Sequence, residues 1–191
     1  ICSGETFTVS PSNAQPTTII PSGTTYVWTV VDNTNVTGES NQASPQSSIS
    51  QALTNSTNVV QTVVYTVTPT SGAQGSCQGG TFTVTVTVSP KPIISQKSAE
   101  ICSGGTFTIS PVNGGAEVVP SGTLYTWVVV ANANVTGESN QASPQSSISQ
   151  ALTNSTNVVQ TVVYTVTPIS GSCTGGTFTV TVTVDPKPVV P

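Results

Sequence analysis

An internal repeat is the feature that most constrains how this chain can fold. The 35 residues from Asn35 to Pro69 recur letter for letter from Asn134 to Pro168. The flanking sequences recur with few changes, and "CQGGTFTVTVTVSPKPII" at 77–94 returns as "CTGGTFTVTVTVDPKPVV" at 173–190. The fold must therefore be complete within one unit of roughly 95 residues, a usual size for a domain.

The segment between the two copies, "SPKPIISQKSAE" at 89–100, carries two prolines that stiffen it. We predict a first domain at 1–94, a linker at 95–100 and a second domain at 101–191. A short linker that contains proline predicts an elongated, semi-rigid arrangement of the two domains.

Each copy shows the alternation of apolar and polar residues that is typical of half-buried strands. In "TFTVTVTV" at 81–88, phenylalanine and valine alternate with threonine. Similar runs are separated by turn-forming Pro-Ser-Gly, Asn-Ser-Thr-Asn and Ser-Gly sequences, and helical spacing is absent. About seven short strands per copy predict an all-β chain of two immunoglobulin-like β-sandwiches. We interpret the aromatic residues in the predicted strands as structural core residues: Trp28, Tyr65, Trp127 and Tyr164.

Four cysteines occupy matching places in the two copies: Cys2 and Cys77, then Cys102 and Cys173. This even, symmetric count predicts one disulfide in each copy, Cys2–Cys77 and Cys102–Cys173, and an oxidising compartment outside the cytosol. Free buried thiols are the alternative. Zinc fits less well, because two cysteines without histidine supply half of a site.

The charge content excludes several partners. The chain has three Lys, no Arg and no His, and its formal net charge is -4. Binding to nucleic acid or to an anionic membrane needs clustered basic residues, so we predict neither contact. The 34 threonines keep so weakly charged a chain in solution. We expect this fragment to be monomeric and to need no cofactor.

Catalytic residues are equally scarce, and we predict that the chain is not an enzyme. Without histidine no ordinary triad can form, and Glu39 with its twin Glu138 are the only acids of the repeated stretch. "DNTNVTGE" at 32–39 offers oxygen ligands for calcium, but a polar turn whose side chains bond the backbone fits better. We predict no metal site. "NVT" at 35–37 and "NST" at 55–57 match the acceptor pattern for N-glycosylation.

The motifs "ICSG", "SISQALTN" and "GGTFTVTVTV" followed by "PKP" together resemble a known family. They are similar to the PKD-like, immunoglobulin-like repeats of the giant SprB-like gliding-motility adhesins of Bacteroidota. The resemblance covers both copies. It implies export by type IX secretion and a place on the bacterial outer surface, where such filaments grip the substratum.

Three functions follow as hypotheses. The first is a structural repeat of a cell-surface adhesin used in gliding motility and attachment, contacting neighbouring repeats and, through the full-length protein, a polysaccharide or solid surface. The second is a polysaccharide-binding module, which the scarcity of aromatic residues outside core positions disfavours. The third is an accessory module of a secreted hydrolase.

Overall fold

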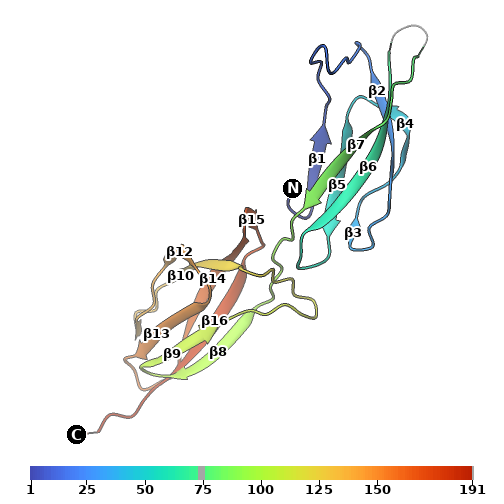
Figure 1. Cartoon of the computed structure of the whole chain (residues 1–191). Helices are drawn as coiled ribbons and strands as arrows, with labels where there is room; N and C mark the ends of the chain where they lie inside the picture. The colour runs from blue at the N-terminus through green and yellow to red at the C-terminus, as the bar shows by residue number, and fades with distance from the viewer. Residues whose placement is uncertain (73–75, 191) are drawn as a thin grey trace. The chain divides into compact units, whose positions relative to one another are not determined.

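The protein is described by a computed structural model, which covers residues 1–72 and 76–190 in the detail used below. The chain divides into two compact units, unit 1 at Ile1–Pro90 and unit 2 at Lys91–Pro191. Every regular secondary-structure element in the described residues is a β-strand, so the predicted all-β fold is confirmed (Figure 1).

Unit 1 is a sandwich of two antiparallel sheets. The smaller sheet has the order β1-β5-β3 and the larger sheet has the order β4-β2-β6-β7. Its strands are β1 (Glu5–Val9), β2 (Thr25–Val30), β3 (Val36–Thr37), β4 (Gln42–Gln46), β5 (Ile49–Asn55), β6 (Gln61–Thr70) and β7 (Phe82–Val88).

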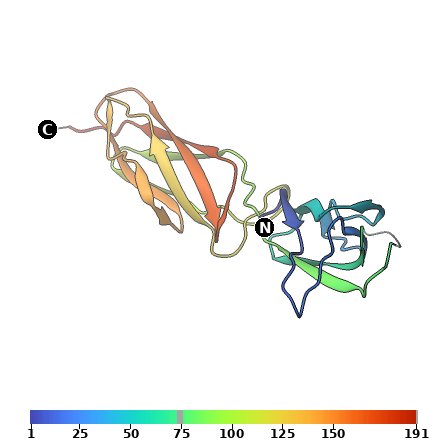
Figure 2. The ribbon, with the colours of Figure 1, turned by 90° about the horizontal axis from the view of Figure 1, so that it is seen from above.

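Unit 2 repeats this architecture with additions at one sheet. The smaller sheet has the order β11-β13-β9, and the larger has the order β12-β10-β14-β16-β8, with β15 paired to β14. Figure 2 shows the strands of this unit, coloured from green to red, from a second side. Its strands are β8 (Lys97–Cys102), β9 (Gly105–Ile109), β10 (Leu124–Val129), β11 (Val135–Thr136), β12 (Gln141–Gln145), β13 (Ile148–Asn154), β14 (Gln160–Ser170), β15 (Cys173–Thr174) and β16 (Phe178–Asp185).

The Thr-Val alternation builds the core of each unit. In β7 the side chains of Val84, Val86 and Val88 are buried, whereas the threonines between them are exposed. β16 buries Val180, Val182 and Val184 in the same way, although the threonines between them are half-buried. Burying one such valine contributes about 1.5–3 kcal/mol, so a single strand supplies a large part of a unit's stability. The threonines favour the extended backbone and face water on the other side.

The second unit begins earlier than its sequence predicted. Residues assigned to the linker form most of β8, which pairs in parallel with β16, and Ile94 packs into the core of unit 2. Ile93 exchanges two backbone hydrogen bonds with Val118. The prediction of a linker at 95–100 is therefore wrong. The segment after Ser95 forms a strand in spite of the two prolines that precede it.

Each unit has two ends that differ in what they carry. The exit end is where the last long strand, β7 or β16, finishes and the chain leaves. The hairpin end is where that strand begins, after the turn from β6 or β14. In unit 2 the C-terminal tail leaves beside the end of β8, and β15 lies at the opposite end (Figure 1).

Candidate functional site

The aromatic residues singled out from the sequence lie in the two cores. Trp28 and Tyr65 belong to the core of unit 1, and Trp127 and Tyr164 belong to the core of unit 2. Both tyrosines have 0% of their surface exposed. The ring of Tyr65 lies 5.2 Å from that of Phe7, joining the two sheets by an aromatic contact.

The polar atoms of these aromatic residues hold the loop between β3 and β4. The Tyr65 hydroxyl donates to Oε1 of Gln51 at 2.9 Å, and Nε2 of Gln51 donates to the carbonyl of Ser40 at 2.9 Å. Nε1 of Trp28 donates to the same carbonyl at 3.1 Å. Burial, and then the nearby carboxylate of Glu39, raise the pKa of Tyr65. The hydroxyl therefore keeps its proton and remains a donor at any physiological pH.

The oxygen-rich turn at 32–39 uses its side chains on its own backbone. Oε1 of Glu39 accepts from the backbone N–H of Asn33, and Oδ1 of Asn33 accepts from the N–H of Asn35. Unit 2 repeats both bonds, although alanine replaces Asp32 there. Within the described residues, no group of three or more His, Cys, Asp and Glu side chains is placed to hold a metal ion.

The two glycosylation patterns differ in access. Asn35 is exposed, whereas Asn55 is 5% exposed. Nδ2 of Asn55 donates to the carbonyls of Val59 and Val88, and Oδ1 accepts from the N–H and hydroxyl of Thr57. The amide nitrogen that a glycan would need is therefore committed to the fold. The "NST" pattern is a structural motif here, and Asn154 makes the same contacts in unit 2.

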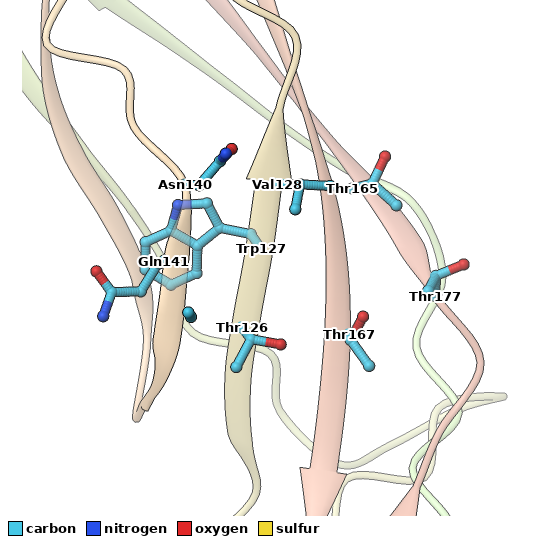
Figure 3. Close-up of a pocket in the computed structure, with 9 residues that line it drawn as sticks. Thr126, Trp127, Val128, Asn140, Gln141, Thr165, Thr167 and Thr177 are labelled. Carbon is cyan, nitrogen blue, oxygen red and sulfur yellow. The ribbon is translucent and has the colours of Figure 1, made fainter.

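A shallow groove on the outer face of the larger sheet occurs in both units. It follows a register shift between β10 and β12, and its volume is about 530 Å³ in unit 2 and about 470 Å³ in unit 1. Figure 3 shows the unit 2 groove, with Thr165, Thr167 and Thr177 on one side of Val128 and the amides of Asn140 and Gln141 on the other. We call these two surfaces the threonine grooves. In unit 1 the groove is lined by Val27, Trp28, Thr29, Asn41, Gln42, Ala43, Thr66 and Thr68.

The threonine grooves offer hydroxyl and amide groups but little aromatic surface. Trp127 lies along the unit 2 groove, yet it is 5% exposed and its Nε1 donates to the carbonyl of Ser139. A sugar ring could therefore not stack on a face of this indole. The groove was missed in the sequence because its residues come from β2, β4 and β6, which only the sheet topology brings together.

The cysteines do not pair as predicted. Cys2 and Cys173 are disulfide-bonded, whereas Cys77 and Cys102 carry free, exposed thiols. The pairs Cys2–Cys77 and Cys102–Cys173 are therefore not formed.

The predicted disulfides do not form because the two cysteines of one unit lie far apart along the sheet. Cys2 pairs with Ser89 at the exit end of unit 1, whereas the carbonyl of Cys77 accepts from the N–H of Ser71 at the hairpin end. The 10-residue β6 separates these positions, and at about 3.3 Å per residue its ends are about 30 Å apart. A disulfide needs Cα atoms within about 7 Å.

Unit 2 has the same separation. Cys173 pairs with Ser170 at the hairpin end, and Cys102 pairs with Asp185 at the exit end. The 11 residues of β14 lie between the two positions. The symmetric cysteine count indicated disulfide chemistry correctly, but it could not show that the two cysteines of one copy face away from each other.

One ion pair is found in the described residues. Lys97 Nζ contacts Oε1 of Glu117, which also accepts from the hydroxyl of Ser95. The hydrogen bond from Lys97 and then that from Ser95 lower the pKa of Glu117. Since copy one has no counterpart of Glu117, this contact fastens the start of unit 2 and is not part of a repeated site. No helix in the described part of the chain could span a membrane.

Two sandwiches that share their central strand order, built from two copies of one sequence, define a tandem repeat protein. The PKD-like domain family matches residues 1–92 and again 99–188, so this chain belongs to that family. Together with the disulfide-bonded cysteines, the family indicates an extracellular domain with a structural or adhesive role.

Solved structures show distant similarity. The tandem immunoglobulin repeats of Dlar are 12% identical over 86% of this chain and 84% of theirs, with a TM-score of 0.30. The human desmocollin-1 ectodomain is 15% identical over 85% of this chain and 34% of its own, with a TM-score of 0.34. A Photobacterium 2,6-sialyltransferase is 19% identical over 49% of this chain and 18% of its own length, with a TM-score of 0.33. A comparison with curated proteins found no match.

Proposed function

We propose that this chain is a structural repeat segment of a large adhesin filament on the bacterial outer surface, used in gliding motility and surface attachment. The observation that carries the proposal is that three polar side chains of the repeated 35-residue stretch hold the backbone of their own unit. Gln51, Asn55 and Glu39 all bond the backbone of their own unit, and the twin residues do the same in unit 2. Side chains that are engaged in this way support a structural role for the repeated stretch.

The composition supports the same role. Hydroxyl-rich outer faces and very low charge make contacts that depend little on salt, because few ions are released or screened. The motifs shared with SprB-like adhesins support export by type IX secretion and a place on a moving surface filament. The proposal includes no enzymatic activity.

The test uses live cells of the source organism and fluorescent Fab fragments raised against this chain. We expect labelling of intact cells and movement of the label along the surface of gliding cells. Labelling that requires permeabilised cells would exclude a surface filament, and immobile label on gliding cells would exclude the motility role.

A polysaccharide-binding module is the second candidate, because the threonine groove recurs with the same residue types in both units. Native gels cast with agar and other polysaccharides test it. If the grooves bind, the chain is retarded and the double variant Thr68→Val/Thr167→Val restores mobility, while the control Thr8→Val/Thr108→Val outside the grooves does not. Equal mobility in all gels would favour a passive repeat.

A further inference from the structure

The two cysteines of each repeat differ in position and in state. Cys2 and its twin Cys102 lie at the exit ends, and we call them exit cysteines. Cys77 and its twin Cys173 lie at the hairpin ends, and we call them hairpin cysteines. The disulfide-bonded cysteines, Cys2 and Cys173, are one of each kind. The free thiols, Cys77 and Cys102, are also one of each kind.

Each free thiol thus has a twin, at the same place in the same fold, that is disulfide-bonded. The backbone contacts beside the twins are shared, although Cys173 is buried, Cys77 is exposed and the loop before Cys77 is three residues longer. Ser3 and Ser103 follow the exit cysteines and bond Asn55 and Asn154 in the same way. Gly79 and Gly175 follow the hairpin cysteines and donate to Pro69 and Pro168 in the same way, at 2.9 Å.

Neither free thiol can find a partner in its own unit, because the cysteines of one unit lie at opposite ends of a long strand, about 30 Å apart. A disulfide partner of either thiol would therefore have to come from outside its own unit.

We propose that Cys102 and Cys77 are docking sites for further copies of this repeat, each forming a disulfide with the cysteine of the other kind. Cys102 takes the hairpin cysteine of a following repeat, and Cys77 takes the exit cysteine of a preceding one. The filament would then be held together by disulfides between repeats as well as by the polypeptide.

The path of the chain explains why opposite kinds should pair. In unit 2 the chain comes in beside the hairpin end, since a Cβ on Gly175 would lie 2.4 Å from the carbonyl oxygen of Pro92. It leaves at the exit end, where Asp185 pairs with Cys102. The exit cysteine of a repeat is therefore at the end from which the chain continues, and the hairpin cysteine is at the end where the chain arrives.

Formation of the bond requires an oxidant, which is a disulfide such as oxidised glutathione. The thiolate of Cys102 attacks glutathione disulfide and releases one reduced glutathione. The thiolate of Cys77 from a second copy then attacks the mixed disulfide and releases the other. Two protein thiols are oxidised to one disulfide, and one glutathione disulfide is reduced to two thiols.

The first arm of the test counts thiols in the native chain with a thiol-reactive dye. We expect two reactive thiols in the purified protein, and peptide mapping should place them at Cys77 and Cys102. A chain with no free thiol and with bridges inside each repeat would overturn the proposal.

The second arm uses the whole chain and glutathione redox buffer. Cys77→Ser keeps only the exit thiol, and Cys102→Ser keeps only the hairpin thiol. Both side chains are exposed, so serine should leave the fold intact. With an affinity tag on one variant, we expect an equal mixture to give mainly linked heterodimers. The wild type should give a ladder of oligomers that dithiothreitol collapses, as expected for head-to-tail contacts.

Random collision of exposed thiols predicts a different result, in which heterodimers make up half of the linked dimers and each variant alone dimerises as fast as the mixture. That outcome would overturn the proposal, as would cross-links mapped to Cys2 or Cys173. The variant Cys77→Ser/Cys102→Ser is the control and should stay monomeric. The experiment depends on the repeat architecture alone, so its result is independent of the Fab test for a gliding adhesin.

Discussion

Asn55 is a buried polar residue on which a large part of the stability of unit 1 depends. Its side chain joins β5 to the end of β7, because Nδ2 donates to the Val88 carbonyl at 3.0 Å and to the Val59 carbonyl at 2.7 Å. Oδ1 accepts from the N–H and the hydroxyl of Thr57, both at 2.8 Å. Alanine at this position would remove all four contacts at once.

The magnitude follows from what each partner loses. In the variant the Thr57 hydroxyl no longer donates to Oδ1 and can donate to the Val59 carbonyl 3.0 Å away, so the loss at that carbonyl is small. The bond to Val88 is buried, and a buried carbonyl that loses a donor costs about 1–3 kcal/mol. With about 1 kcal/mol more for the lost acceptor of Thr57, Asn55→Ala should destabilise unit 1 by about 2–4 kcal/mol.

Differential scanning calorimetry of the whole chain measures this effect. In a domain of this size 1 kcal/mol shifts Tm by about 4–8 °C, so the unit 1 transition should fall by roughly 10–25 °C. Asn154→Ala should lower the unit 2 transition similarly, since its bonds to Val158 and Val184 are 2.7 and 2.9 Å long. The control Asn35→Ala lies on the surface and should change stability by less than about 0.5 kcal/mol.

The reasoning would be refuted if Asn55→Ala behaved like Asn35→Ala. Such a result would mean that water replaces the side chain without loss, and that the "NST" turn does not depend on its asparagine.

Two further predictions concern single units. Gly38→Ala should lower the free energy of unfolding by about 3 kcal/mol or more, because φ is 98° and a Cβ would lie 2.1 Å from a backbone carbonyl oxygen of β5. The control Gly4→Ala has open space around it and should lower it by only about 1 kcal/mol. Equal losses for the two variants in urea unfolding would argue against the clash. Glu117→Gln should remove up to about 1 kcal/mol from unit 2 at neutral pH. Since the folded pKa of Glu117 is lowered, by Lys97 above all, this contribution exists above the unfolded pKa of about 4.3 and is lost as pH falls through the folded value. Wild type and variant should therefore converge in melts at low pH, and a gap that persists there would count against the ion pair.

Local sequence patterns predicted the strands well where exposed and buried side chains alternate along one strand. The strand around Val84 and Val86 has period 2, so the sequence indicates both its conformation and its buried face. The same logic failed at 95–100, where the prolines before Lys97 suggested a linker. The alternating segment after the prolines forms β8 because the edge of β16 in the folded sheet is open to pair with it.

For the candidate sites, the sequence indicated which side chains are buried but not which side chains of other strands they contact. The burial of Trp28 and Tyr65 agrees with their place in alternating strands, but their roles in fixing the Ser40 loop depend on Gln51 of another strand. The threonine grooves combine residues of three strands and carry no local signal. For such surfaces, chain topology has to be known first.

The sequence by itself determined the repeat, the all-β character, the buried faces of the strands and the disulfide chemistry, because each of these depends on residue type and spacing along the chain. The tertiary structure alone decided which cysteines can meet. Cys2 and Cys77 belong to one repeat, yet Cys2 pairs with Ser89 at the exit end, whereas Cys77 accepts a hydrogen bond from Ser71 at the hairpin end. Sequence separation says nothing of that distance, because strand direction and register, set by the packing of the whole sandwich, place the two ends about 30 Å apart.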